Sequence, residues 1–236
     1  MVARIILTRH GHVDGIEPPR FRGRMDIALT ALGVAQANAA AQRIGAISRP
    51  AAIYTSPMSR CITTGEAIAK ACSAPSQVLD QLNDLDYGLW QWKTHDEIRT
   101  AFADQYETWH TAPQLFRFPQ GESLQDLVAR AADALRGVLQ RHRDQTVVLV
   151  SHDSVNRALL TQMLDQPLSA YSRIAVEPCG ITEIEFVGNI ARVLRINETQ
   201  HLDAIQTATE RTKKASEVPA PTQNCELSRK LQAFLV

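Results

Sequence analysis

The chain alternates short apolar runs with segments of helical periodicity up to about residue 165. Three apolar runs have the length of a strand: Ile5-Ile6-Leu7, residues 51–55 and residues 146–150. Three other segments are predicted to be helices: the alanine-rich residues 30–47, residues 154–164, and residues 123–139, whose apolar side chains repeat along one helical face. Strands that are apolar throughout and separated by helices are typical of an α/β domain with a largely parallel sheet.

The pattern changes at residues 180–197, where two strand-like runs flank Gly188-Asn189. A two-residue connection of this kind predicts an antiparallel hairpin. The predicted fold is therefore a three-layer α/β sandwich with a mostly parallel central sheet, helices on both faces and a C-terminal antiparallel hairpin. We expect this domain to span residues 1–197.

Polar residues at the predicted helix starts indicate where each helix begins. Thr30 is a candidate N-cap, and Ser123-x-x-Asp126 resembles a capping box. After the strand at 51–55, Ser56 is the expected cap, with Pro57 at the first helical position.

Residues 198–236 are polar, with many Thr, Lys, Pro and Ser residues up to Asn224. We expect a tail that is partly disordered or that docks as a short helix. The helix is suggested by four apolar residues at helical spacing: Leu227, Leu231, Phe234 and Leu235.

The composition of the chain limits the partners and the cellular location that we expect for it. Apolar residues make up 44% of the chain and the formal net charge is zero, so neither nucleic acid nor a membrane is an expected partner. The four cysteines form no CxxC pair, which predicts neither a zinc site nor a disulfide framework. The first residues contain too short an apolar run for a signal peptide, so a cytoplasmic location is expected.

Charged and polar side chains follow three of the predicted strands. Arg9 and His10 end the first strand, Arg60 lies in the helical turn after the second, and His152 follows the strand at 146–150. If these strands are neighbours, the residues meet at one edge of the sheet, where ligands bind in open α/β folds. Two guanidinium forks suit a phosphate group, and an imidazole among cations can act as its nucleophile. The pattern favours phosphoryl transfer through a phosphohistidine.

Several motifs resemble the histidine phosphatase superfamily, in its phosphoglycerate mutase-like branch. They are "RHG" after the first strand, "FRGRMDIALTALGVAQA", "TSPMSRCITT", "GES" before a long helix, and "VSHDSVNRAL", and the similarity runs from residue 4 to about 165. The resemblance implies that His10 is the catalytic nucleophile that becomes phosphorylated. It also implies that Arg9, Arg60 and His152 bind the phosphoryl group, with His152 part of the catalytic set.

The general acid of this family is usually a glutamate in an "LxE…G" pattern. The chain has "LNDLDYG" at residues 82–88, which puts Asp84 at that position. Because aspartate is one methylene shorter, its reach to the leaving oxygen is open, and Asp86 is the second candidate. We favour Asp84 as the group that protonates the leaving oxygen and later deprotonates the attacking water.

Position 12, often glutamate in the family, is His12 here. The pair His10-x-His12 has no third ligand at a suitable spacing, so we expect neither a metal nor another cofactor. His12, Arg22, Asp86 and Asp153 are weaker candidates for the substrate pocket. Specificity is expected in the segments around 12–24 and 88–120.

The function predicted from these features is hydrolysis of a small phosphorylated metabolite by a metal-independent phosphatase. A phosphoglycerate mutase would use the same histidine and return the phosphoryl group to the substrate. His152 follows Asp84 by only 68 positions, which leaves less room for a cover than mutases of this family typically have and favours hydrolysis. A non-catalytic phospholigand-binding protein is the third reading, and a homodimer is possible.

Overall fold

The computed structural model describes residues 2–205, 207 and 208. Met1–Leu202 form one compact unit, which contains the whole sheet. In the second unit, the described residues 203–205, 207 and 208 are helical. The predicted helix around Leu227 to Leu235 lies outside the described residues. No helix in the described part of the chain is long and apolar enough to cross a membrane.

The centre of the main unit is a six-stranded mixed sheet with the order β3-β2-β4-β1-β5-β6. Its strands are β1 (Val2–Arg9), β2 (Ala52–Thr55), β3 (Ser76–Val78), β4 (Thr146–Ser151), β5 (Ile181–Val187) and β6 (Ile190–Glu198). The first four are parallel to one another, whereas β5 pairs antiparallel with both β1 and β6. The mostly parallel sheet and its C-terminal antiparallel hairpin are confirmed.

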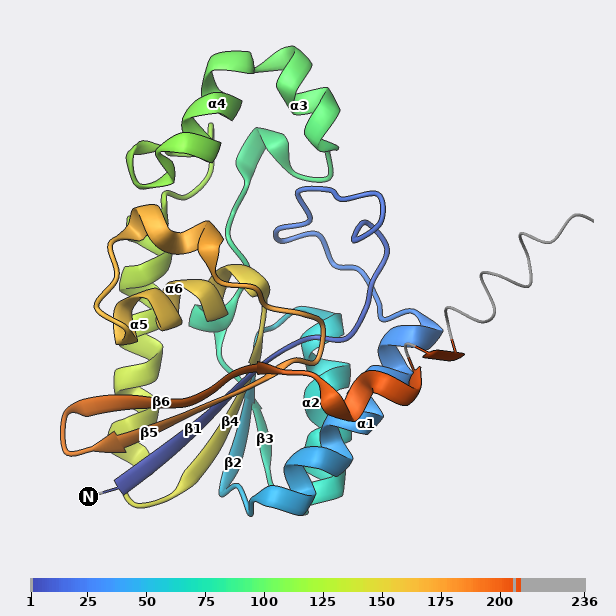
Figure 1. The fold of residues 1–236 in the computed structure, drawn as a ribbon, viewed down its shortest axis with the longest axis vertical. Helices are drawn as coiled ribbons and strands as arrows, with labels where there is room; N and C mark the ends of the chain where they lie inside the picture. The colour runs from blue at the N-terminus through green and yellow to red at the C-terminus, as the bar shows by residue number, and fades with distance from the viewer. Residues whose placement is uncertain (1, 206, 209–236) are drawn as a thin grey trace, which may run out of the picture. The chain divides into compact units, whose positions relative to one another are not determined.

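Helices cover both faces of the sheet (Figure 1). The helices are α1 (Ala31–Ile47), α2 (Ser59–Cys72), α3 (His95–Ala101), α4 (Ala103–Thr111), α5 (Leu124–Arg141) and α6 (Asp153–Met163). Short 3-10 turns are η1 (Asp80–Leu82), η2 (Gly88–Trp90), η3 (Pro113–Leu115), η4 (Leu168–Arg173) and η5 (Gln200–Leu202). The three-layer arrangement follows from these helices and the sheet.

Side chains of the central strands alternate between two hydrophobic cores. On β1, Ile5 and Leu7 pack in the core that includes Leu127 of α5 and Leu159 of α6. Ile6, between them, belongs to the core with Ile44 of α1 and Ile68 of α2. The strand must be apolar throughout because successive side chains face opposite layers.

Two of the three predicted helix starts are confirmed. The Thr30 hydroxyl accepts from the backbone N–H of Gly33, and Ser123 with Asp126 forms the capping box of α5. The prediction for Ser56 and Pro57 is wrong, because α2 begins at Ser59 with Met58 as an N-cap that makes no side-chain hydrogen bond. The Ser56 hydroxyl lies instead 2.8 Å from a ring nitrogen of His152.

The segment between β3 and α5 carries α3 and α4 beyond the upper ends of the strands (Figure 1). Its anchor is Trp90, whose side chain is fully buried and packs against Phe21, Phe116 and Phe118. Phe21 belongs to the loop after β1, so Trp90 joins two segments that are distant in sequence. Both lie in the ranges from which specificity is expected.

Candidate active site

Three neighbouring strands end at the same edge of the sheet and carry the predicted residues. Arg9 of β1 pairs with Ser151 of β4, and Thr55 of β2 pairs with Val150 of β4. The backbone N–H of His10 donates to the carbonyl of Ser151 at 3.0 Å. The strands are therefore adjacent, and the residues that follow them gather at their carboxyl ends.

The glycine after His10 allows the chain to pass close to the start of α1. A Cβ at Gly11 would collide with the backbone of Gly33, and a Cβ at Gly33 would collide with the backbone of His12. The N–H of Gly11 donates to the Thr64 hydroxyl at 3.2 Å. The backbone on both sides of His10 is thus fixed by hydrogen bonds, which holds its ring in one place.

His10 is buried, with 1% of its surface exposed. The hydrogen-bond partner of its ring shows which nitrogen carries the proton. Nδ1 lies 2.7 Å from the carbonyl oxygen of Gly11, and because that oxygen only accepts, Nδ1 carries the proton. The Nε2 lone pair of the neutral ring is then free. Burial and the charge of Arg60 lower the pKa of His10 well below its usual value, so the ring stays neutral around pH 7.

His152 lies beside His10, with ring centroids 5.3 Å apart in an edge-on arrangement. Its Nδ1 lies 3.2 Å from a terminal nitrogen of Arg60, which only donates, and its Nε2 lies 2.8 Å from the Ser56 hydroxyl. Nδ1 is therefore the acceptor and Nε2–H the donor to Ser56. Burial and the charge of Arg60 also lower the pKa of His152 well below its usual value.

Two buried arginines supply the positive charge of the site. Arg60 has no exposed surface, and its terminal nitrogens donate to the carbonyls of Met25 at 2.6 Å and Gly23 at 2.7 Å. Arg9 is 6% exposed and donates to the carbonyl of Val176 at 2.8 Å. The Nε–H groups of Arg9 and Arg60 have no acceptor among the described residues. Burying guanidinium groups with unpaired donors is costly, and an anionic ligand would offset that cost.

Asp84 lies within this cluster. One carboxyl oxygen, Oδ2, lies 3.2 Å from Arg60 and 3.4 Å from Nδ1 of His152. The other, Oδ1, accepts from the Ser154 hydroxyl at 2.5 Å and from the Leu85 N–H at 2.8 Å. A proton on this carboxyl therefore belongs on Oδ2. Burial raises the pKa of Asp84 and outweighs the opposing charge of Arg60, which favours the protonated form that a general acid needs.

Asp86, the second candidate acid, has other partners. Its carboxyl lies 3.5 Å from Arg24 and accepts from the N–H of Gly88 at 2.9 Å. Its side chain is 30% exposed, compared with 4% for Asp84. The structure shows no contact between Asp86 and the histidines or Arg60, so the geometry favours Asp84 as the acid.

The weaker pocket candidates lie around the main cluster. Nδ1 of His12 lies 3.0 Å from the Thr30 hydroxyl. Arg22 donates to the carbonyl of Gly15 at 2.6 Å and lies 4.0 Å from Asp153. The Nε–H of Arg22 is buried without an acceptor among the described residues, like those of Arg9 and Arg60. Arg22 therefore adds positive charge to the site, whereas His12 is held at its edge.

Asp153 is the negative counterpart of this arginine group. It lies 3.8 Å from Arg157 on the same helix. Burial acts to raise the pKa of Asp153, but the charges of Arg9, Arg157 and Arg22 outweigh it and lower that pKa. A carboxyl whose pKa is lowered by folding contributes its full stabilisation at pH values above its unfolded-state pKa of about 4. The stabilisation is lost as pH falls below that value.

We expect Asp153→Asn to lower the free energy of unfolding at pH 7 by about 3 kcal/mol, because it leaves buried arginines without their anion. The deficit relative to the wild type should shrink as pH falls from about 4 towards the lowered pKa of Asp153, since wild-type Asp153 then becomes neutral too. Urea unfolding measured across that pH range tests this. Asp133→Asn is the control, because Asp133 is 64% exposed and pairs with the exposed Arg136. Equal effects of the two substitutions would contradict the account.

Several residues of the site were not found from the sequence. Ser56 accepts from His152, Ser154 donates to Asp84, and Thr64 accepts from Gly11. The Cys61 thiol donates to the carbonyl of Ser151 at 3.4 Å and also lies 3.5 Å from Nε2 of His152. All four lie inside quoted motifs or beside catalytic candidates, but a serine, threonine or cysteine next to a helix start carries no signal that separates capping from contact with a catalytic side chain.

No group of three or more His, Cys, Asp or Glu side chains in the described part of the chain is placed to hold a metal ion.

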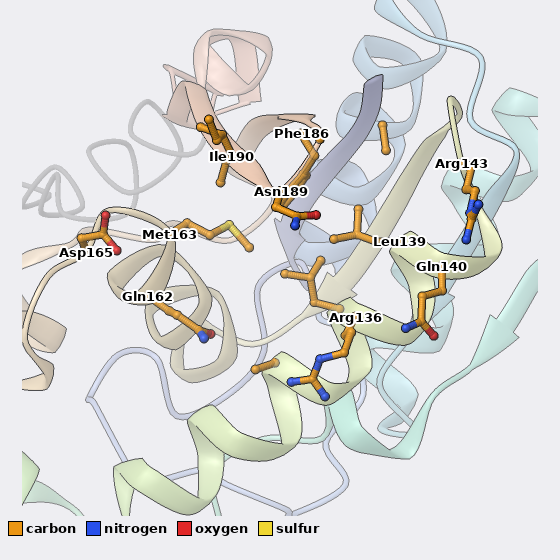
Figure 2. Close-up of a pocket in the computed structure, with 15 residues that line it drawn as sticks. Arg136, Leu139, Gln140, Arg143, Gln162, Met163, Asp165, Phe186, Asn189 and Ile190 are labelled. Atoms are coloured by element: carbon orange, nitrogen blue, oxygen red, sulfur yellow. The ribbon is translucent and has the colours of Figure 1, made fainter. Parts of the chain in front are cut away.

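A separate hollow of about 740 Å³ lies between α5, the end of α6 and the β5–β6 hairpin (Figure 2). Its labelled lining residues include Arg136, Leu139, Met163 and Asn189, and it contains none of the candidate catalytic residues. The hollow is therefore separate from the cluster of candidate catalytic residues at the strand ends.

Comparison with known proteins agrees with this geometry. The model of the histidine phosphatase superfamily (branch 1) matches residues 5–199, and the chain belongs to this superfamily. The resemblance inferred from the motifs is confirmed, and the match extends through the β5–β6 hairpin, beyond the range to which the motifs pointed.

The relatives include both hydrolases and mutases by name. Phosphoserine phosphatase 1 of Hydrogenobacter thermophilus is 28% identical over 201 residues, which cover 85% of this chain and 95% of that protein. A probable phosphoglycerate mutase, GpmB of Proteus mirabilis, is 30% identical over 188 residues, or 78% of this chain and 85% of that protein. The solved structure of Bacillus stearothermophilus YhfR has a TM-score of 0.81 at 30% identity and covers 85% of this chain and 100% of that one.

Proposed function

We propose that the protein is a phosphatase that hydrolyses a small phosphomonoester through a phosphohistidine on His10. The supporting observation is a neutral, buried His10 whose Nε2 lone pair is free beside two guanidinium groups. A neutral nucleophile among cations suits a phosphate dianion, because Arg9 and Arg60 offset the charge that would otherwise repel the two reactants. The name of the Hydrogenobacter relative supports a hydrolase.

In the first step, Nε2 of His10 attacks phosphorus and forms a nitrogen–phosphorus bond. The bond from phosphorus to the ester oxygen breaks, and its electron pair stays on that oxygen. Oδ2–H of Asp84 donates its proton to the departing oxygen, which leaves as an alcohol. Arg9 and Arg60 bind the non-bridging oxygens, and His152 holds Arg60 and Asp84 in place through its Nδ1 edge.

In the second step, water attacks the phosphorus of phosphohistidine, and the Asp84 carboxylate takes a proton from that water. The nitrogen–phosphorus bond breaks, and its electron pair returns to Nε2 of His10. Inorganic phosphate leaves, and the protonated Asp84 is ready for the next substrate. One carboxyl thus acts as acid and then as base, which requires a pKa near the working pH. The raised pKa of Asp84 suits this double role.

Hydrolysis is favoured over phosphoryl return by the shortness of the segment between the acid and His152. Between η2 and α5, this segment contains two short α-helices, α3 with seven residues and α4 with nine, and the 3-10 turn η3. His10 itself is buried, and a small cover makes it easier for water to reach the phosphohistidine once the product alcohol has left. A mutase needs the opposite, because water would compete with the returning substrate.

We expect release of inorganic phosphate from p-nitrophenyl phosphate, phosphoserine or 3-phosphoglycerate to continue unchanged in excess EDTA. The reason is that every proposed step uses only protein groups and water. The measurement is phosphate release by wild type with and without chelator. Activity that EDTA removes and a divalent cation restores would contradict the mechanism, and conversion of 3-phosphoglycerate to its isomer without phosphate release would favour the mutase.

A further inference from the structure

The "GES" motif before α5 places a partly buried carboxylate, that of Glu122, next to the loop that carries Asp84. Glu122 faces Arg130, which belongs to α5, and both side chains are 17% exposed. Nε of Arg130 donates to one carboxylate oxygen at 2.8 Å, and its NH2 group donates to the other at 2.9 Å. This two-point geometry fixes the plane of the guanidinium group.

The remaining donors of Arg130 reach the backbone that carries Asp84. Its NH1 group donates to the carbonyls of Gln81 at 2.8 Å and Asn83 at 2.6 Å. Its NH2 group donates to the carbonyl of Asp84 itself at 2.8 Å. One side chain thus binds three carbonyls within four residues. Together with the two bonds to Glu122, these contacts use five donors in one fixed plane, which arginine alone among the side chains presents.

A second arginine links the same loop to the phosphate-binding residues. Arg24 donates to Glu122 at 2.9 Å and to the carbonyl of Asp84 at 3.3 Å. The carbonyls of Gly23 and Met25, on either side of Arg24, accept from Arg60. The backbone of Asp84 and the guanidinium of Arg60 are therefore tied to one short segment of chain.

The Glu122 carboxylate is also bound by the loop directly, because it accepts from the N–H of Asp86 at 3.0 Å. Burial acts to raise the pKa of Glu122, but hydrogen bonds from Arg130 and its charge lower it overall, so the carboxylate stays ionised. The pair is therefore a charged, two-point clamp rather than a loose surface contact. None of these atoms touches His10.

We propose that Arg130, held by Glu122, is a positioning residue that sets the place of the Asp84 carboxyl for proton transfer. This inference rests on the proposed function, in which Asp84 is the acid and base. Arg130 acts through the backbone: it fixes the Asp84 carbonyl, and with it the direction in which the side chain reaches Arg60 and His152. Aspartate is short, so a small displacement of its backbone moves Oδ2 away from the leaving oxygen.

The test compares two variants with the wild type. Arg130→Met removes both the charge and the hydrogen bonds, whereas Arg130→Lys keeps the charge but loses the planar set of donors. An alkyl phosphomonoester needs its leaving oxygen protonated, whereas p-nitrophenolate leaves without that help. We expect kcat/KM for the alkyl ester to fall about 10-fold to 10²-fold in both variants, and kcat/KM for p-nitrophenyl phosphate to change much less. Arg136→Met on the same helix is the control, because Arg136 is 65% exposed and pairs with Asp133.

A double variant separates positioning from a general loss of structure. When Asp84 is already asparagine, Arg130→Met should leave the ratio of alkyl to aryl kcat/KM unchanged, because there is no proton donor left to misplace. The inference about Arg130 would be overturned, with the proposed function intact, by either of two results. One is an Arg130→Met variant that lowers kcat/KM equally for both esters, and the other is a further shift of the ratio in the Asp84→Asn background. An Asp84→Asn variant with a wild-type ratio would instead overturn the assignment of Asp84 on which it rests.

Discussion

His10→Ala is expected to lower kcat/KM for every phosphomonoester by at least about 10³-fold, because the substitution removes the nucleophile. His10 is buried among cations, with backbone hydrogen bonds on both sides and Nδ1 held by the Gly11 carbonyl. The neighbouring His152 offers no free lone pair, since both of its ring nitrogens are engaged by Arg60 and Ser56. Steady-state phosphate release at saturating and limiting substrate measures the loss.

His142→Ala is the matched control for this prediction. His142 is the C-cap residue after α5, and its ring forms hydrogen bonds with Tyr54 and Gln145 rather than with any candidate catalytic residue. Its removal should change kcat/KM little. If His10→Ala kept activity comparable to that of His142→Ala, the phosphohistidine account would be wrong for this protein.

Asp84→Asn is expected to lower kcat/KM for alkyl phosphomonoesters about 10²-fold to 10⁴-fold, with a much smaller effect on p-nitrophenyl phosphate. The asparagine amide fills the same space and can accept from Ser154, but it has no acidic proton to give. For the aryl ester the second step should then become limiting, because the variant also lacks a base. A burst of p-nitrophenol followed by slow turnover is the expected signature in rapid-mixing experiments.

The pH dependence of kcat/KM identifies the same group. Burial raises the pKa of Asp84, so its protonated fraction at any given pH exceeds that of an exposed aspartate. As pH rises through that pKa, the acid is lost and kcat/KM for an alkyl ester should decline. Asp84→Asn should remove this dependence when the same substrate is compared across variants.

Asp86→Asn is the control, since Asp86 lies two residues away and contacts Arg24 and Gly88 instead of the histidines. It should preserve both the leaving-group dependence and the pH profile. If Asp86→Asn lost them and Asp84→Asn kept them, the acid role would move to Asp86.

The strand ends could be predicted because their signals are local and the topology of parallel sheets is restrictive. Apolar runs such as that around Ile6 are expected to be strands with both faces covered. In a parallel sheet, the polar residues that follow such strands lie together at the carboxyl-end edge. The three-residue strand β3 could not be found in this way, because Ser76–Val78 is exposed and carries no apolar pattern. It is held by pairing with β2, a non-local interaction.

Ser56 shows why a correct motif can be given a wrong role. A serine followed by proline at a strand exit fits a helix start, yet here its hydroxyl faces His152 and α2 begins three residues later. The choice depends on His152, which lies 96 residues away. Only the folded chain brings the two together.

The role of Arg130 was hidden for a related reason. Its partners are mostly backbone carbonyls 46 to 49 residues away, and a carbonyl is present at every position of the sequence. The "GES" motif marked Glu122 without indicating its use. The reach of Asp84, left open by its short side chain, is likewise decided by tertiary contacts, which place its carboxyl against Arg60.

The most direct test of the central claim is to trap the covalent intermediate. The Asp84→Asn variant, in which loss of the intermediate should be slow, is mixed with p-nitrophenyl phosphate, quenched in alkali within one turnover, and digested for mass spectrometry. The account predicts a phosphoryl group on the peptide that contains His10, stable in alkali and lost in acid. Turnover by the wild type without any such group, or a phosphoryl group attached to another residue, would contradict it.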